Sequence, residues 1–370
     1  MRILGFMSGT SLDAIDMAIL ETDGEAIQAF GPAGERKLSD ATRDIVIAAT
    51  DAARVWSRGA PEPVVFAEAA RAVADEHLHA GLAFLSEHSV APGALDLAGF
   101  HGQTVLHERP SAGRIGRTVQ LGDAGRLARG LGVPVAHGFR LDDVAAGGEG
   151  APLAPIYHAA LARYAGLAAP VAVLNLGGVG NITLMRQGGD FQAFDTGPAN
   201  GMIDLMIQAR GLGRCDVDGG YALAGQVSPA ALETLLSHPY FQAPPPKSLD
   251  RYDFPMAPVD GLSVQDAAAT LTAFTCGAVA AALTWLSDDP PRTLIAAGGG
   301  RHNPAIMDGL RAAMPELTVI SAEQAGWRGD AIEAEAFAYL AARTARGLPI
   351  SFPGTTGVER AMTGGMIVRP

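Results

Sequence analysis

Four glycine-rich turns, distributed over both halves of the chain, limit most strongly what this sequence can fold into. They occupy Ser8–Asp13, Gly177–Asn181, Asp195–Gly201 and Gly298–Gly300, each after a short apolar run that is typical of a strand. Glycine allows the backbone to approach an anionic group closely and to direct several N–H groups at it. A single such turn is more often only a turn, but four of them favour a phosphate-binding cleft between two lobes.

The first two turns lie in similar surroundings. Ile3–Met7 and the alternating residues from Ile15 to Leu20 predict a hairpin around the first turn, and Val171–Leu176 opens a second unit of the same shape. Helices are expected at 41–56, 65–85, 124–131, 156–164 and 265–286, and a glycine-rich loop at 138–155. We therefore predict an α/β protein with two lobes, 1–145 and 146–370, in which the C-terminal segment packs back on the first lobe.

Composition excludes several classes of partner. The formal net charge is -12, and Lys37 and Lys247 are the only lysines, so we expect no nucleic-acid partner. We expect no signal peptide and no apolar run long enough to cross a bilayer, hence no membrane partner. Cys215 and Cys276 lie far apart and predict neither a disulfide framework nor a cysteine metal site. A cytoplasmic protein is the simplest reading.

Familiar nucleotide and hydrolase motifs are missing. The sequence contains no G-x-x-x-x-G-K-[ST], no G-x-G-x-x-G after a strand, and no G-x-S-x-G. Phosphoryl transfer without a P-loop lysine still requires a divalent cation, and Mg²⁺ takes one or two carboxylates together with waters. Asp13 and Asp195 are the carboxylates inside the candidate turns, so they are the expected Mg²⁺ ligands, while Asp216 and Asp218 predict a solvated turn.

The order of these motifs resembles the actin-like and sugar kinase superfamily, and the whole chain is similar to the anhydro-N-acetylmuramic acid kinase family. The resemblance is carried by MSGTSLDAID (7–16), FHGQT (100–104), QLGD (120–123), FRLDDVAAGGEGAPLAP (139–155), NLGGVGNIT (175–183), FDTGP (194–198), AGGGRHN (297–303) and DAIEAEAFAYLA (330–341). It implies a two-lobed actin-like or hexokinase-like ATPase fold with an active-site cleft between the lobes.

The resemblance also implies a reaction. Such a kinase adds water across the 1,6-anhydro bond of anhydro-N-acetylmuramic acid and transfers the ATP γ-phosphate to O6, in peptidoglycan recycling. It implies ATP binding by Gly9, Thr10, Ser11, Leu12, Asp13, Ala14, Ile15, Asp16, Gly177, Gly178, Asn181, Asp195, Gly197, Gly298 and Gly299. It further implies a homodimer, with the sugar and ATP as small-molecule partners.

The family pattern places the catalytic aspartate at Asp143. The reaction requires a carboxylate that takes a proton from the attacking water. Asp142 is the rival, but adjacent side chains point apart, so only one of the two is expected to face the sugar. Arg140 either pairs with the lactyl carboxylate of the sugar or holds the loop in place. Glu333 is expected to bind sugar, on a different helix face from its neighbour Ile332.

His101 and Gln103 follow a predicted buried strand and are further candidates for sugar contact. Three positions depart from the family pattern: Gly138 replaces an acidic residue, and Ala14 and Ala199 replace glycines. Two other functions stay open at this point. One is a kinase for another anhydrosugar such as levoglucosan, and the other is an actin-like regulatory ATPase that uses the same cleft to change conformation.

Overall fold

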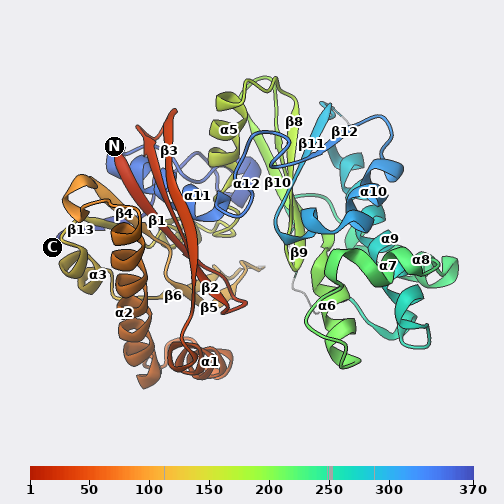
Figure 1. The fold of residues 1–370 in the computed structure, drawn as a ribbon, viewed down its shortest axis with the longest axis horizontal. Coiled ribbons are helices and arrows are strands. Elements are labelled where there is room, and N and C mark those ends of the chain that lie inside the picture. The colour runs from red at the N-terminus through yellow and green to blue at the C-terminus, as the bar shows by residue number, and fades with distance from the viewer. Residues whose placement is uncertain (112, 248, 250–252, 287) are drawn as a thin grey trace. The chain divides into compact units, whose positions relative to one another are not determined.

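The computed structural model describes residues 1–111, 113–247, 249, 253–286 and 288–370, and its backbone divides into two compact units (Figure 1). Unit 1 comprises Met1–Tyr164 and Ala331–Pro370, and unit 2 comprises Ala165–Asp330. Each unit combines a sheet with helices, which confirms the α/β class. The expected lobes 1–145 and 146–370 stay a prediction, since compact units of backbone do not by themselves define functional lobes.

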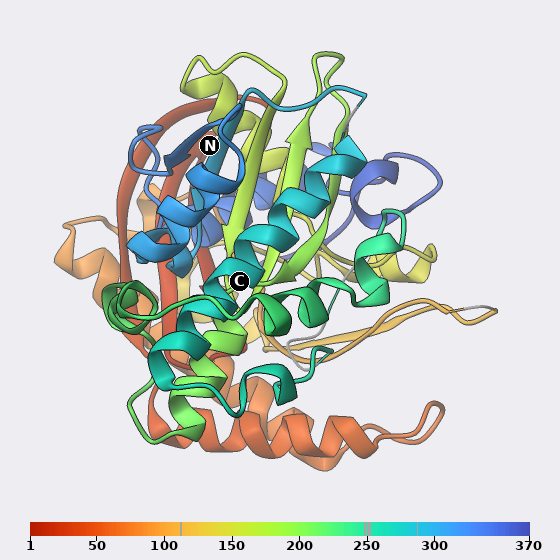
Figure 2. The same cartoon turned by 90° about the vertical axis from the view of Figure 1, so that its right-hand side faces the viewer.

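Unit 1 is built on a six-stranded sheet in the order β13-β7-β4-β1-β2-β3. Its strands are β1 (Arg2–Ser8), β2 (Ala14–Thr22), β3 (Ile27–Lys37), β4 (Leu97–Phe100), β7 (Val135–His137) and β13 (Met366–Val368). β1 pairs with β2 in antiparallel and with β4 in parallel orientation. A separate hairpin of β5 (Gln103–Glu108) and β6 (Arg117–Leu121) extends away from this sheet in Figure 2.

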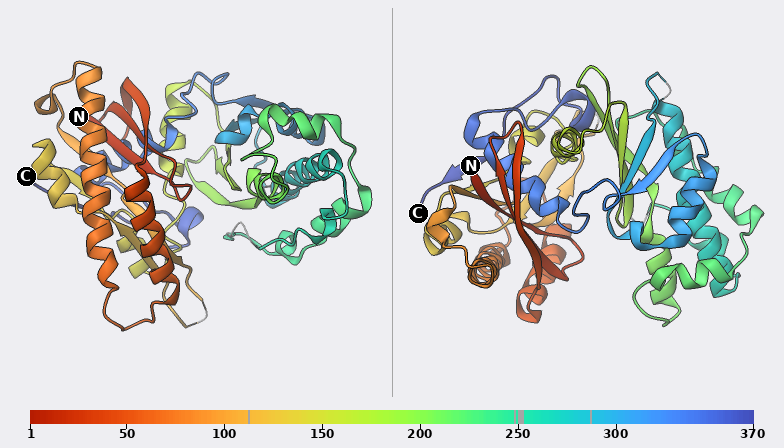
Figure 3. Two further views of the ribbon diagram at one scale, coloured as in Figure 1. Left: turned by 60° about the horizontal axis from the view of Figure 1, so that its bottom comes forward. Right: turned by 45° about the horizontal axis from the view of Figure 1, so that its top comes forward.

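Helices pack on both faces of the unit 1 sheet. The α-helices of the unit are α1 (Asp40–Val55), α2 (Val64–Glu87), α3 (Ala124–Leu131), α4 (Leu141–Ala145), α5 (Pro155–Tyr164), α11 (Ile332–Arg346) and α12 (Pro353–Thr356). The helices α1 and α2 lie side by side (Figure 3), and with α3 they bury Leu4 and Phe6 of β1. Gly5 lies between these two residues and faces α11, because successive residues of a strand point to opposite faces. Hence α11 packs on the face of the sheet opposite to α2.

Unit 2 contains a five-stranded sheet in the order β10-β9-β8-β11-β12. The strands are β8 (Val171–Leu176), β9 (Val179–Met185), β10 (Phe191–Pro198), β11 (Thr293–Ala297) and β12 (Thr318–Ser321). Its helices are α6 (Asn200–Ala209), α7 (Gly220–Ala224), α8 (Pro229–Leu236), α9 (Val264–Leu283) and α10 (Pro304–Ala313). Side chains of α6, α9 and α10 form one apolar core with the strands. The parallel strands β8 and β11 end together, so the turns that follow them lie at one edge of the sheet.

One helical stretch in the described part of the chain is long and apolar enough to cross a membrane. It spans Val264–Leu286, with a mean hydropathy of 1.6, and 67% of that window is buried inside the fold. The expectation that no apolar run approaches this length is therefore wrong. A core helix meets the same criteria, because its surface is covered by neighbouring helices and strands rather than by water.

The predicted loop at 138–155 is wrong in one part, since Leu141–Ala145 forms the short helix α4. Asp142 and Asp143 lie in its first turn, where negative charge favours the positive end of the helix dipole. Val144 is buried and anchors the turn. Gly138, just before α4, has φ +69, a left-handed conformation that favours glycine. An acidic side chain at this position would be strained.

Candidate functional site

The first glycine turn joins β1 to β2 and leaves much of its backbone exposed. The N–H of Leu12 donates to the carbonyl of Gly9 (3.2 Å), and Leu12 has φ +55. Asp13 Oδ1 accepts bonds from the Ser11 hydroxyl (2.6 Å) and the Ala14 N–H (3.0 Å). Thr10, Ser11 and Asp13 are exposed, whereas Ile15 is buried and Asp16 continues β2. The turn thus presents polar groups to solvent on a rigid strand pair.

The side chain of Gln103 supports this turn through a hydrogen bond. Its side chain is almost fully buried, and its Nε2 donates to the carbonyl oxygen of Gly9 (3.1 Å). Since its amide group is engaged with the turn, this geometry favours a role in holding the backbone of the turn. The predicted sugar contact by Gln103 stays a prediction.

Asp143 is buried on α4, while its neighbour Asp142 is exposed. The two adjacent carboxylates therefore point apart, as expected. Asp143 Oδ1 accepts a hydrogen bond from the Gly150 N–H (2.6 Å), and Oδ2 accepts one from the Thr356 hydroxyl (2.5 Å). A Cβ at Gly148 would lie 2.3 Å from Asp143 Oδ1, so the loop can pass this carboxylate only as glycine.

Arg140 holds the same loop from its other end. Its Nη1 donates to the carbonyl of Gly150 (2.8 Å), and its Nε donates to His101 Nε2 (3.0 Å). Burial lowers the pKa of Arg140 to about 10, and the negative charges of Glu333 and Asp143 oppose that shift. The guanidinium stays protonated at neutral pH. Of the two roles predicted for Arg140, these contacts favour holding the loop.

Two histidines near Arg140, His101 and His107, are neutral. Burial, and then the positive charge of Arg140, lower the pKa of His101 well below its ordinary value. The same two causes, in the same order, lower the pKa of His107 to about 4. Because Nε2 of His101 accepts from Arg140, the ring proton of the neutral form lies on Nδ1. His101 thus acts as a hydrogen-bond acceptor for Arg140, and its predicted sugar contact stays untested.

Glu333 lies in the first turn of α11, exposed to solvent, while its neighbour Ile332 is buried. This arrangement matches the expectation that the two side chains lie on different faces. Desolvation by the surrounding protein raises the pKa of the Glu333 carboxyl, and the charge of Arg140 opposes this effect. The side chain is exposed, so the raised pKa reflects the loss of part of its hydration to neighbouring protein atoms.

Unit 2 brings the other three glycine turns together. The N–H groups of Ala199 and Gly201 donate to the Gly178 carbonyl (3.1 and 3.0 Å), so the turn after β8 touches the start of α6. Gly298 follows β11 with φ +73, and a Cβ there would lie 2.4 Å from the Asn175 side chain. Asn181 pairs with Asn175 across the β8–β9 hairpin. Turns as far apart in sequence as Gly177 and Gly298 therefore share one edge of the sheet.

Asp195 lies in β10, next to an irregularity in the strand pairing before Gly197. Its Oδ2 accepts from the Leu249 N–H (2.7 Å), and its carbonyl accepts from the Tyr240 hydroxyl (2.5 Å). A Cβ at Gly197 would lie 2.6 Å from Ala278 on α9, so close packing also requires this glycine. Oxygen ligands of this kind suit Mg²⁺.

Among the described residues, no group of three or more His, Cys, Asp or Glu side chains could hold a metal ion. Mg²⁺ needs only one or two carboxylates, so assignment of this ion to Asp13 and Asp195 stays a prediction. The expectation of a solvated turn is wrong for Asp216. Its buried carboxylate accepts from the N–H groups of Tyr221 and Ala222 at the start of α7 (2.8 and 3.0 Å), while Asp218 is exposed.

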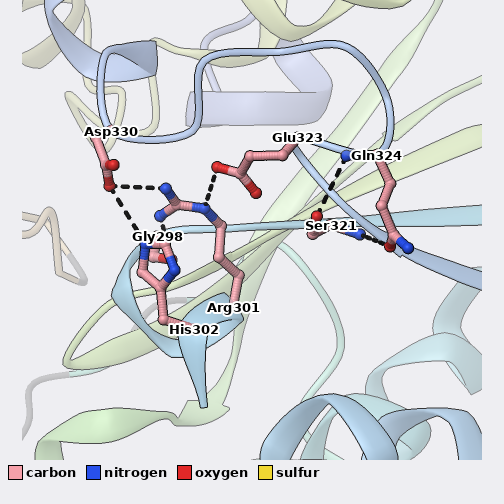
Figure 4. Close-up of polar contacts among 7 residues, drawn as sticks. All are labelled: Gly298, Arg301, His302, Ser321, Glu323, Gln324 and Asp330. Atoms are coloured by element: carbon pink, nitrogen blue, oxygen red, sulfur yellow. Dashed lines mark hydrogen bonds and ion pairs between the residues drawn. The ribbon is translucent and has the colours of Figure 1, made fainter. Parts of the chain in front are cut away.

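The sequence analysis missed two residues that hold the candidate turns. Arg301 donates to the Gly298 carbonyl (2.9 Å), to Glu323 (2.8 Å) and to Asp330 (2.7 Å), and its side chain is almost fully buried (Figure 4). Thr356 is the other, through its bond to Asp143. A sequence signal existed for it, because two threonines between glycines follow a proline in Phe352–Val358.

Comparison with known proteins gives consistent matches along the whole chain. The family model described as anhydro-N-acetylmuramic acid kinase matches residues 1–370. A protein of that name from Caulobacter vibrioides is 68% identical over 368 residues, covering 100% of this chain and 99% of the relative. Relatives of the same name from Phenylobacterium zucineum and Rhizobium rhizogenes are 64% and 50% identical, covering 100% and 98% of both chains respectively.

Solved structures with a similar arrangement are more distant in sequence. The (R)-2-hydroxyglutaryl-CoA dehydratase component A of Acidaminococcus fermentans is 13% identical, with a TM-score of 0.47, over 92% of this chain and 99% of that one. A ROK family glucokinase from Streptomyces griseus, in complex with glucose and AMPPNP, is 12% identical with a TM-score of 0.40, over 92% and 99% of the two chains.

Proposed function

Because the chain belongs to the anhydro-N-acetylmuramic acid kinase family, we propose that it phosphorylates 1,6-anhydro-N-acetylmuramic acid with ATP. In the proposed reaction, water opens the 1,6-anhydro bond and O6 takes the γ-phosphate, which gives N-acetylmuramic acid 6-phosphate and ADP. The observation that carries this proposal is the full-length match at 68% identity. The buried carboxylate of Asp143 supplies a group that fits the hydrolytic step.

Asp143 is the proposed general base. An ionised carboxylate has about four acceptor sites. In Asp143 the Gly150 N–H takes one and the Thr356 hydroxyl takes another. The remaining lone pairs can accept a proton from the water that attacks the anomeric carbon. A base held by two donors loses little orientational freedom when the substrate binds. Arg140 keeps the loop in place, and Glu333 is the proposed sugar ligand from α11.

ATP binding is proposed for the glycine turns of both units. In unit 1 these are residues Gly9–Asp16, and in unit 2 they are Gly177, Gly178, Asn181, Asp195, Gly197, Gly298 and Gly299. Exposed backbone and hydroxyl groups of the first turn suit phosphate oxygens. Asp13 and Asp195 offer carboxylate oxygens for Mg²⁺, which when bound would neutralise charge on the phosphates.

Several further features belong to this proposal and rest on family membership. They are a place in peptidoglycan recycling, a cytoplasmic location, a homodimer, and two lobes divided between residues 145 and 146. The sugar and ATP are the proposed partners, with neither nucleic acid nor membrane involved. The net charge of -12 supports the absence of a nucleic-acid partner.

A coupled ADP-release assay tests the function. Wild type, Asp143→Asn and Asp142→Asn are assayed with ATP, Mg²⁺ and 1,6-anhydro-N-acetylmuramic acid. We expect Asp143→Asn to lower kcat by roughly 10²–10⁴-fold, the usual contribution of a general base, and Asp142→Asn to leave it nearly unchanged. If the sugar does not stimulate ADP release by the wild type, the proposed substrate is wrong. Levoglucosan, assayed in parallel, would then show whether another anhydrosugar is accepted.

A further inference from the structure

We propose that Thr356, near the C-terminal end of the chain, is a positioning residue for Asp143. Its hydroxyl fixes the orientation of the carboxylate that acts as base. This inference rests on the proposed function, because it gives Thr356 a part in the hydrolytic step. It concerns a contact between residues 213 positions apart in sequence.

The geometry assigns the hydroxyl proton of Thr356 to Asp143. Thr356 is fully buried, and its Oγ1 lies 2.5 Å from Asp143 Oδ2. The alternative acceptor is the carbonyl of Phe352, at 3.5 Å. A hydroxyl has a single proton, and the shorter distance together with the charge of the carboxylate decides which acceptor receives it. The carbonyl of Phe352 already accepts from the Thr355 hydroxyl (3.1 Å) and so does not need Thr356.

The backbone of Thr356 holds the same loop. Its carbonyl accepts a hydrogen bond from the Glu149 N–H (2.7 Å). The next residue, Gly150, donates its N–H to Asp143 Oδ1. Gly150 of the loop and Thr356 of helix α12 therefore each donate a hydrogen bond to one oxygen of the Asp143 carboxylate. Rotation of that carboxylate would break at least one of these bonds, so a single rotamer is retained before substrate arrives.

The titratable groups near Asp143 differ in charge. Arg140 is positively charged and interacts with Asp143 and with Glu333. His101 contacts Arg140, and His107 lies beside Gly150, 3.3 Å from the position that a Cβ there would take. Both histidines are neutral at neutral pH, so neither adds a positive charge beside Asp143. Asp142, Glu149 and Glu333 are the like charges of the neighbouring segments, and Glu333 interacts with Arg140.

The chain offers a matched control for this contact. Thr355 is buried on the same helix, and its hydroxyl donates to the Phe352 carbonyl instead of Asp143. Thr355→Val removes a hydroxyl from the same helix without touching the carboxylate. Thr356→Val removes the donor to Asp143 with almost no change in volume, and Thr356→Ser keeps the hydroxyl while losing a methyl group.

The test compares these three variants with the wild type in kcat and in KM for the sugar. We expect Thr356→Val to lower kcat/KM roughly ten- to hundredfold, as for loss of a hydrogen bond to a charged group. The loss should lie in kcat rather than in KM, because a misoriented base slows the chemical step without removing a proposed sugar ligand. Thr356→Ser should stay within about threefold of the wild type, and Thr355→Val should keep the wild-type kcat and KM.

A second readout does not depend on turnover. Crystal structures of the wild type and of Thr356→Val show the orientation of the Asp143 carboxylate directly. A rotated or disordered carboxylate in Thr356→Val supports the inference. An unchanged carboxylate, or a loss of activity that is the same in Thr355→Val, overturns it and leaves Thr356 with a structural role. A wild type that ignores the sugar would count against the proposed function, whereas the crystal structures would still decide the role of Thr356.

Discussion

Replacing Gly5 with alanine should loosen the helix that carries Glu333. Gly5 lies on β1 beside Gly99 of β4, and both face α11. A Cβ at Gly5 would lie 1.9 Å from the carbonyl oxygen of Ala334 and 2.7 Å from the N–H nitrogen of Ala338. All of these atoms belong to the backbone, so no side chain can rotate away to make room.

The size of the loss in stability follows from how far α11 and β1 must move apart to make room for the new Cβ atom. Ordinary van der Waals contact begins at 3.4 Å, so the helix and the strand would have to separate by roughly 1.5 Å from the 1.9 Å contact. Such a shift disrupts a fully buried interface, and we expect a loss of about 3 kcal/mol or more in the free energy of unfolding. At 2–4 °C for each kcal/mol, the melting temperature should fall by roughly 6–12 °C.

Thermal unfolding followed by circular dichroism measures this change, with Gly93→Ala as the control. Gly93 is exposed in unit 1, and a Cβ there would have no heavy atom within 4 Å. We also expect a higher KM for the sugar in Gly5→Ala, because Ala334 adjoins Glu333. If Gly5→Ala melts at the same temperature as the wild type and Gly93→Ala, the close packing of α11 on β1 is refuted.

Two further outcomes are expected. Burial lowers the pKa of His77 and of His158 to about 4, so the unfolded chain takes up more protons as the pH falls from 6.5 to 4. Each histidine should therefore cost roughly 2 kcal/mol of stability at pH 5 relative to pH 7, and equal urea midpoints at the two pH values would contradict this. Arg301→Met removes three hydrogen bonds and frees the Gly298 turn, which should weaken ADP binding several-fold in calorimetry. Arg301→Lys should recover only part of the affinity, because an ammonium group cannot reach all three acceptors, and full recovery would argue against this clamp.

Local patterns in the sequence predicted local structure well. The spacing of apolar residues placed a helix at 124–131, where α3 spans Ala124–Leu131. Turns follow strands at the first, second and fourth glycine-rich segments, but the predicted turn Asp195–Gly201 is wrong in its first part, since β10 continues to Pro198 and α6 begins at Asn200. The short helix α4 was missed because glycines on both sides suggested a loop, while acidic residues in its first turn and a buried Val144 stabilise it. Five residues give too little periodicity to distinguish a helix from a loop.

Contacts between distant segments could not be read from the sequence. The Gln103 amide supports the turn at Gly9, 94 positions earlier, a contact that no local pattern indicates. No sequence pattern indicates that the Arg301 guanidinium donates hydrogen bonds to both Gly298 and Asp330 (Figure 4). Its side chain is accommodated because Gly329 passes over the guanidinium, where a Cβ would lie 2.3 Å from Nε. Such pairings depend on the tertiary fold, which brings the ends of strands β11 and β12 together.

The polar groups around Asp143 come from both ends of the chain, because unit 1 contains both ends. After Ala331 the chain belongs to unit 1 again, where α11 packs on β1 and β13 pairs with β7. This return brings Glu333 into electrostatic contact with Arg140, and Thr356 into contact with Asp143. A carboxylate on a five-residue helix has little rigidity of its own. It acquires rigidity from the C-terminal segment, so the precision of the proposed base depends on residues that become its neighbours only when the chain is folded.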